Sequence, residues 1–218
     1  MTQVIQAAKP LLRGWLHAGA FPVVACAGLT LIVVAPTWQA RLACAVYAVT
    51  SALMFGTSGY YHRRGSPSPR LAETLRRLDH ANIYLIIAGT YTPFAVIALD
   101  GAARTAVLLT IWVGAAAGVA FRTVWLAAPR WLYTSLYIVL GWTAVLFAPQ
   151  FLDGLGVPAL VFVIVGGLLY SAGGVVYALK RPNPSDRWFG FHEVFHAFTV
   201  AAYVSQFVAV ALVAAKAA

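Results

Sequence analysis

Seven long stretches without a charged residue place the strongest constraint on how this chain folds. Each lacks Asp, Glu, Lys and Arg and has at least 17 residues, the lower limit for a helix that crosses about 30 Å of hydrocarbon. A chain in lipid must satisfy its own backbone hydrogen bonds, and runs such as 160–169 lack the alternation of a β-barrel strand. We therefore predict an all-α integral membrane protein, a seven-transmembrane helix bundle. The stretches are 14–40, 42–62, 80–99, 105–121, 131–152, 154–179 and 194–215.

We expect these stretches to form a single membrane domain over residues 1–218. Apolar residues beside Lys9 and Arg13 predict an amphipathic lead-in over 1–20 that lies on the membrane surface. The longest loop runs from about 63 to 79, and its 71–78 segment is expected to form a short interfacial helix. The spans themselves are expected at roughly 20–38, 42–62, 80–99, 105–121, 131–152, 156–179 and 192–213.

Composition agrees with a membrane protein and excludes several other classes. The chain is 61% hydrophobic and 10% charged, whereas soluble domains have roughly 45–50% and about 25%. Its net charge of +9 does not indicate a nucleic-acid partner, because the basic residues stand in short clusters between apolar stretches. The two cysteines, Cys26 and Cys44, both lie in apolar stretches and are expected to be packing thiols.

The distribution of basic residues predicts how the chain is oriented. If the N-terminus is inside, twelve of the 15 Lys and Arg residues lie in cytoplasmic segments, and only Arg41, Arg104 and Lys216 lie outside. By the positive-inside rule we expect a multi-pass protein of the plasma membrane, with its N-terminus cytoplasmic and its C-terminus outside.

Titratable side chains gather at one predicted depth of the membrane. His62 ends the second span, Asp79 and His80 open the third, and His192, Glu193 and His196 open the seventh, all on the predicted cytoplasmic side. Ionisable groups in membrane segments are costly, so such a convergence indicates a functional site. Taken alone, His17 and His80 are more simply interpreted as polar residues with satisfied hydrogen bonds, and Asp79 as a partner of Arg76 or Arg77.

The spacing of these residues predicts a zinc site. His192 and His196 are four residues apart and share one helix face, as do Ser58 and His62. A third histidine from another helix completes a His₃ set with one position left for water, whose pKa zinc lowers to about 7. Asp79 would then hold or deprotonate that water, orient a ligand, or itself be the fourth ligand. A His₃ set also suits other divalent ions.

The same residues resemble the signature motifs of a known family. Ser58-Gly59-Tyr60-Tyr61-His62, Asp79 followed by Gly89-Thr90-Tyr91-Thr92-Pro93-Phe94, and His192-Glu193-Val194-Phe195-His196 resemble those of the hemolysin III branch of the progestin and adiponectin receptor (PAQR) superfamily. The opening from Leu12 to His17 is similar to the start of that branch. The resemblance covers nearly the whole chain in order and spacing.

The resemblance implies a fold, a metal and a reaction. The fold has seven helices with the N-terminus inside. The metal is a zinc bound by His62, His192 and His196 near the cytoplasmic face, with Asp79 and Ser58 close to its water. The implied reaction is hydrolysis of a lipid amide such as ceramide. We expect hydrolysis of a lipid amide or ester, with Asp79 taking the proton of the water and Ser58 donating to the oxyanion or to Asp79 as catalytic residues. This chain lacks the long N-terminal extension of the animal receptors, so binding of a protein hormone is not implied.

Three other functions are compatible with parts of the pattern. The H-E-x-x-H sequence at 192–196 and Asp153 resemble an intramembrane protease, but the charge distribution places Asp153 outside and His192 inside. We expect Glu193, one residue off the histidine face, to point toward lipid headgroups or Arg187. A structural zinc in a lipid-responsive sensor of membrane homeostasis is the main alternative. A pore is disfavoured, because the spans contain few polar residues to line it.

Overall fold

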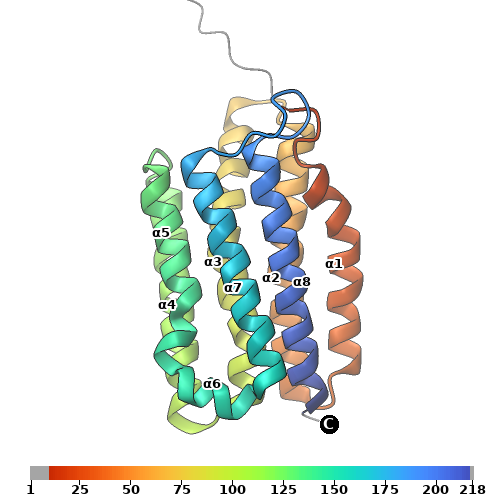
Figure 1. The fold of residues 1–218 in the computed structure, drawn as a ribbon, viewed down its shortest axis with the longest axis vertical. Coiled ribbons are helices and arrows are strands. Elements are labelled where there is room, and N and C mark those ends of the chain that lie inside the picture. Colours follow the sequence, from red (N-terminus) through yellow and green to blue (C-terminus); the bar gives the residue numbers. More distant parts are fainter. Residues whose placement is uncertain (1–9, 217–218) are drawn as a thin grey trace, which may run out of the picture.

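The computed structural model describes residues 10–216, and this part of the chain folds into a bundle of long helices (Figure 1). Seven segments are long and apolar enough to cross a membrane, which confirms the predicted seven-span architecture. The helices are α1 (Trp15–Val34), α2 (Trp38–Arg64), α3 (Pro69–Ala98), α4 (Gly101–Val124), α5 (Arg130–Gly141), α6 (Ala148–Leu155), α7 (Val157–Leu179) and α8 (Phe191–Lys216), with a 3₁₀ segment, η1 (Trp142–Phe147), between α5 and α6.

Consecutive helices pack side by side, and the last returns to the first. The α1–α2, α2–α3, α3–α4 and α7–α8 pairs make the most extensive contacts, while α8 also packs against α1 and α3. The described chain therefore starts and finishes at opposite ends of the bundle (Figure 1). One end carries residues 10–14 and the loops that follow α2, α4 and α7; we call it the histidine end, because it holds His62 and His192.

The third helix is longer than the predicted span and absorbs the expected interfacial helix. The 71–78 segment is the beginning of α3 rather than a separate element, so that expectation is wrong. The reason lies at Ser68, whose hydroxyl accepts a hydrogen bond from the backbone N–H of Leu71 (3.3 Å), and at Pro69, which occupies the first helical position. No helix-breaking residue separates this start from Asp79.

The fifth span is interrupted. Between α5 and α6 the backbone forms the tighter 3₁₀ turns of η1. Some backbone N–H and C=O groups there lack their α-helical partners and bond to other groups. The Tyr91 hydroxyl of α3 donates to the carbonyl of Gly141 (2.6 Å) and accepts from the N–H of Ala144 (2.7 Å). One side chain thus replaces missing helical hydrogen bonds at membrane depth.

The first span begins at Trp15. Residues 15–20 are the first turns of α1, residues 10–14 form a turn that precedes it, and the remainder of the expected lead-in, 1–9, lies outside the described residues. Gly14 has a φ of 78°, in the left-handed region that favours glycine, and this turn directs the chain from the surface into α1.

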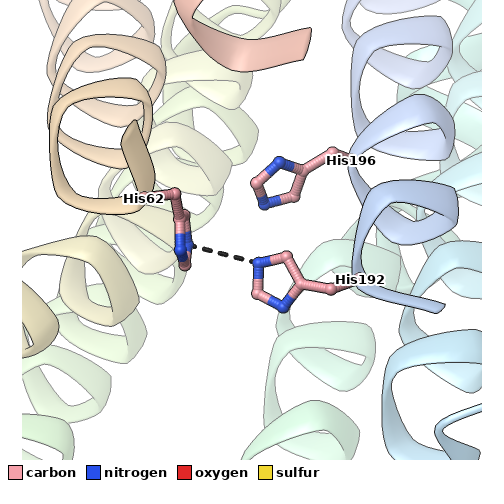
Figure 2. Close-up of side chains that lie close together, drawn as sticks. All are labelled: His62, His192 and His196. Atoms are coloured by element: carbon pink, nitrogen blue, oxygen red, sulfur yellow. Dashed lines mark hydrogen bonds between the residues drawn. The ribbon is translucent and has the colours of Figure 1, made fainter. Parts of the chain in front are cut away.

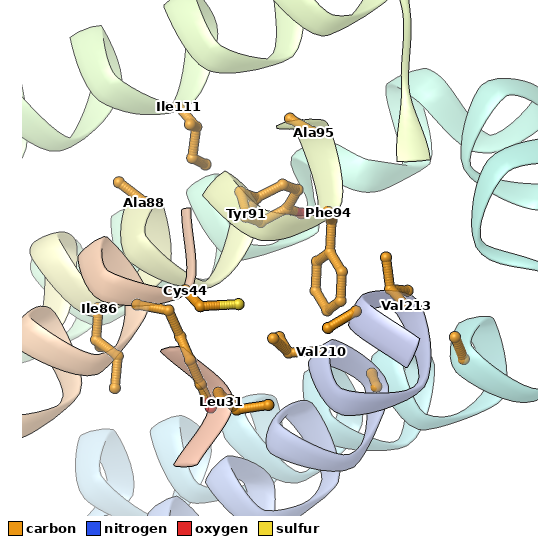
Figure 3. Packing of buried hydrophobic residues seen from close by; sticks show 14 of the residues in the cluster. Leu31, Cys44, Ile86, Ala88, Tyr91, Phe94, Ala95, Ile111, Val210 and Val213 are labelled. Atoms are coloured by element: carbon orange, nitrogen blue, oxygen red, sulfur yellow. The ribbon is translucent and has the colours of Figure 1, made fainter. Parts of the chain in front are cut away.

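The apolar core lies away from the histidine end. Cys44 of α2, Phe94 of α3 and Val210 of α8 meet there, each at most 2% exposed (Figure 3). Because these three helices are held by apolar packing along this part of their length, their other ends are fixed relative to one another. That fixed geometry positions the site described next.

Candidate metal centre

Three histidines from two helices converge at one end of the bundle. His62 lies in the last turn of α2, and His192 and His196 lie in the first two turns of α8. Their potential ligand atoms are all within 4.8 Å of one another, and the Nε2 atoms of His62 and His192 are 3.2 Å apart. Figure 2 shows His62 facing the other two across the gap between these helices.

The beginning of α8 is held by specific contacts, and these fix the direction of its two histidines. The backbone N–H of Phe191 donates to Oδ1 of Asn183 (2.8 Å), and the N–H of Gly190 donates to Oε2 of Glu193 (2.8 Å). The second contact is the half of a capping box in which a residue in the first turn reaches back to the helix start. With the first turn in place, the four-residue spacing points His192 and His196 to the same side.

Asp79 and Ser58 lie beside the cluster. Oδ2 of Asp79 is 3.4 Å from Nε2 of His62, and Ser58, one turn before His62 on α2, is 4% exposed. The side chains predicted to form one site, from three different helices, are therefore neighbours. His80 belongs to the same region, and its Nδ1 is 2.7 Å from the carbonyl oxygen of Arg76, which agrees with the expectation of a satisfied polar residue.

Two separations in this donor set are compatible with a tetrahedral zinc ion, and the three histidine donor atoms all lie within 4.8 Å of one another. Four donors held 2.0–2.1 Å from zinc at tetrahedral angles lie about 3.3–3.4 Å apart. The His62–His192 and His62–Asp79 separations of 3.2 and 3.4 Å match such edges. Nδ1 of His196 is buried and has no hydrogen-bond partner among the described residues.

His17 is a member of the site that the sequence did not identify. It is 3% exposed, and its ring stacks on that of His196 with centroids 3.8 Å apart and planes 4° from parallel. Neither ring nitrogen has a hydrogen-bond partner among the described residues, so the expectation of a satisfied polar residue is wrong for His17. A ring nitrogen binds a metal in the plane of its ring. The His17 and His196 rings lie in separate parallel planes, so the two rings cannot both bind the same ion. His17 instead packs against His196 and holds its ring in place.

Glu193 points away from lipid and away from the cluster. Its Oε1 lies 2.6 Å from Nε of Arg13, and the carboxylate is 1% exposed. The expected direction toward headgroups or Arg187 is therefore wrong, because the chain preceding α1 folds back over the start of α8. Glu193 does not line the cavity next to the histidines.

A cavity opens from the cluster into the bundle. It leaves about 130 Å³ for the centres of water-sized molecules, and it lies among α3, α5, α7 and α8 with Met54 and Ser58 of α2 on its wall. Its histidine end is lined by Asp79, His192 and His196, and its far end reaches Gln206. Gln206 is fourteen positions after His192 on α8, which corresponds to a rise of about 21 Å along a helix. Most of the wall between is apolar or aromatic, including Ile83, Ile87, Tyr137, Ile138 and Phe195.

The candidate third ligand of an intramembrane protease lies elsewhere. Asp153 belongs to α6, and its neighbour Gly154 packs against the carbonyl of Ala98 at the end of α3. Asp79 is near the other end of the same helix, so Asp153 and the histidines are at opposite ends of the bundle.

Comparisons with known proteins identify the family. The chain is 27% identical to "Hemolysin-3" of Bacillus cereus over 211 residues, covering 95% of this chain and 93% of that protein. It is also 27% identical to the "Hemolysin-3 homolog" of Bacillus subtilis (strain 168) over 162 residues, 74% of this chain and 72% of that protein. The model of the family described as haemolysin-III related matches residues 5–207. The chain therefore belongs to the haemolysin-III-related family, a branch of the PAQR superfamily.

Proposed function

We propose that this protein is a zinc-dependent hydrolase of a lipid amide or ester. The observation that carries the proposal is the position of the cluster. Asp79, His192 and His196 line the polar end of a cavity whose wall is otherwise largely apolar, and His62 lies directly against His192 and Asp79. A cavity with this polarity accepts an acyl chain and leaves the chain's polar head at the histidines.

The three histidines would hold the metal, and two further residues would take part in the reaction. Zinc in a His₃ set acts as a Lewis acid and lowers the pKa of a coordinated water to about 7. Asp79, with Oδ2 near His62, accepts the proton of the attacking water. Ser58, buried on the cavity wall, donates a hydrogen bond to the developing oxyanion or to Asp79.

The substrate belongs to the membrane rather than to the aqueous phase. The long axis of the cavity follows α3 and α8, which cross the membrane, so a bound chain lies roughly along the membrane normal. The loops at the histidine end carry most of the basic residues, and the positive-inside rule therefore directs this end to the cytoplasm of a plasma-membrane protein. The reaction takes place at the cytoplasmic side.

The test separates turnover from metal binding. Purified protein is incubated with vesicles that contain an N-acyl sphingoid lipid or a phospholipid, and released fatty acid is measured. We expect product from one of the lipids with the wild type, and a loss of about 10²–10⁴-fold in Asp79→Asn while zinc remains bound. Asp153→Asn, an exposed carboxylate at the opposite end, is the control and retains the wild-type rate.

A non-enzymatic role is the second candidate, and the position of Asp79 favours it. Its 3.4 Å separation from His62 is that of a fourth zinc ligand, and a set of four protein ligands is typical of structural sites. The protein would then be a lipid-responsive membrane sensor in which zinc joins α2, α3 and α8. In that case wild-type protein releases no product from any lipid, and Asp79→Asn loses zinc.

A further inference from the structure

The segment that precedes the first span runs across the histidine end of the bundle. The backbone N–H of Leu11 donates to the carbonyl of Arg187 (2.9 Å), and that of Leu12 to the carbonyl of Trp188 (3.3 Å). These two bonds attach the segment to the loop between α7 and α8. The loop in turn leads into the helix that carries His192 and His196.

The next residue makes a charged contact with that helix. Nε of Arg13 lies 2.6 Å from Oε1 of Glu193, with 18% of the Arg13 side chain and 1% of the Glu193 side chain exposed. The second carboxylate oxygen accepts the N–H of Gly190. Oε2 of Glu193 is therefore hydrogen-bonded at the start of α8, and Oε1 faces the Arg13 guanidinium as an ion pair. Arg13 is the only cation within ion-pair distance of Glu193 among the described residues.

The rest of the segment touches the cluster itself. Gly14 packs so closely on α2 that a Cβ placed on it would lie 2.6 Å from Cβ of His62. One turn later, the His17 ring covers one face of His196. A single stretch of eight residues, 10–17, thus contacts both helices that supply the histidines.

We propose that residues 10–17 form a cover over the histidine cluster, and that Arg13 and Glu193 are the positioning residues that hold this cover in place. The cover closes the side of the cluster that faces the aqueous loops. The cavity remains as the route to the histidines, so a ligand reaches them from within the bundle. This inference depends on the proposed function only for the identity of the metal ion.

The physical reason is the cost of an unpaired buried charge. Removing one partner of a buried ion pair leaves the other uncompensated, whereas removing both charges is often tolerated. In Arg13→Met the Glu193 carboxylate loses its cation. The unpaired carboxylate is more stable when it contacts water, and the movement that exposes it displaces the cover. Glu193→Gln leaves Arg13 without its anion but keeps an oxygen to accept the N–H of Gly190. In the double variant, neither side carries a charge.

The first readout needs no metal. Metal-free protein in detergent is treated with diethyl pyrocarbonate, and modification of His17 and His196 is followed by mass spectrometry. Both rings are at most 3% exposed, so we expect slow modification in the wild type. We expect a rate about tenfold higher in Arg13→Met and Glu193→Gln, and a return toward the wild-type rate in the double variant. Asp100→Asn, which removes an exposed ion pair at the opposite end, is the matched control.

The second readout measures positioning of the ligands. Zinc affinity is determined by competition with a chelator for the same four proteins and the control. Loss of a residue that orients ligands typically weakens metal affinity by about 10–100-fold, and we expect this in both single variants with recovery in the double variant. A residue with only a packing role gives no such recovery.

Each result decides a separate question. Unchanged modification rates in both single variants overturn the cover. Equal loss of zinc affinity in the singles and the double overturns the charge-pair role of Arg13 and Glu193. A wild type that binds no zinc overturns the proposed function, while the modification rates still test the cover.

Discussion

At the histidine end of the bundle the buried side chains include imidazoles and charged groups, whereas toward the opposite end they are apolar or polar without charge. Glu193 and His196 are 1% and 2% exposed, and so is Phe94 at 2% in the apolar half, yet only the first two carry titratable groups. Burying ionisable groups in a membrane protein is costly, and α2, α3 and α8 also meet in an apolar cluster away from the histidines (Figure 3). The bundle therefore does not need buried charges in order to form, and this supports a functional role for the histidine end.

The two ends also differ in their ion pairs. Arg13 and Glu193 are largely buried, whereas Asp100 and Arg104 at the other end have side chains 96% and 39% exposed. An exposed pair contributes little because water and salt screen it, but a buried pair penalises the loss of either partner. Variants at the two ends should therefore affect different properties.

The largest expected effect is loss of the metal. His62→Ala, His192→Ala and His196→Ala should each reduce the zinc content of purified protein from near one per chain to near zero, because a tetrahedral site with only two histidines binds weakly. Metal analysis after detergent purification provides the measurement. Helix content by circular dichroism should stay unchanged, since the apolar half still holds the helices.

His80→Ala is the matched control for this prediction. His80 lies beside Asp79 on the cavity wall, but its Nδ1 contacts the carbonyl of Arg76. Zinc content should remain near one per chain. Loss of zinc in His80→Ala, or none in the wild type after purification with added zinc, would contradict the assignment of the three ligands.

The convergence of His62, His192 and His196 could be predicted from the sequence because it follows from simple rules. The charge-free stretches predicted the spans. Consecutive spans run in opposite directions, so the end of the second span lies on the same side of the membrane as the starts of the third and the seventh. The four-residue spacing of His192 and His196 placed both on one helix face. None of these steps requires knowing which helices are neighbours.

The unpredicted features depend on neighbours that are distant in the sequence. Arg13 pairs with Glu193, and His17 stacks on His196, only because α1 packs against α8. Arg122 follows the fourth charge-free stretch, yet its side chain is 1% exposed and donates to the carbonyls of Trp125 and Leu126. The interruption at η1 likewise depends on the Tyr91 hydroxyl, fifty residues away from Gly141. No local pattern marks such contacts.

The next effect belongs to the apolar half. Phe94→Ala should lower the free energy of unfolding by about 3–5 kcal/mol, because truncation of a buried phenylalanine loses contacts and leaves a cavity. Zinc content per folded chain should not change. Thermal unfolding in detergent is the measurement. Val33→Ala, on a side chain 74% exposed, is the control with little expected change. If Phe94→Ala removed zinc as well, the two ends would not be independent.

A kinetic effect of similar size is expected at Ser58. Ser58→Ala should reduce lipid hydrolysis by about 10²–10³-fold if the hydroxyl stabilises the oxyanion, while zinc content stays near one. Ser51→Ala is the matched control on the same helix, because the Ser51 hydroxyl is fully buried and donates to the carbonyl of Tyr47 (2.7 Å). Equal rates in Ser58→Ala and wild type would exclude Ser58 from the reaction and leave Asp79 as the remaining catalytic candidate.

The smallest effect is expected for Asp100→Asn. The change breaks the contact between Oδ1 of Asp100 and the Arg104 guanidinium (2.8 Å), but the carboxylate is almost fully exposed. Arg104 keeps its bond from Nε to the carbonyl of Leu99 (2.7 Å), which continues to join the end of α3 to the start of α4. We therefore expect no measurable change in melting temperature, zinc content or histidine modification. A clear change in melting temperature, zinc content or histidine modification would mean that the opposite end depends on charge as much as the histidine end does. The difference between the buried side chains at the two ends would then no longer indicate where the functional site lies.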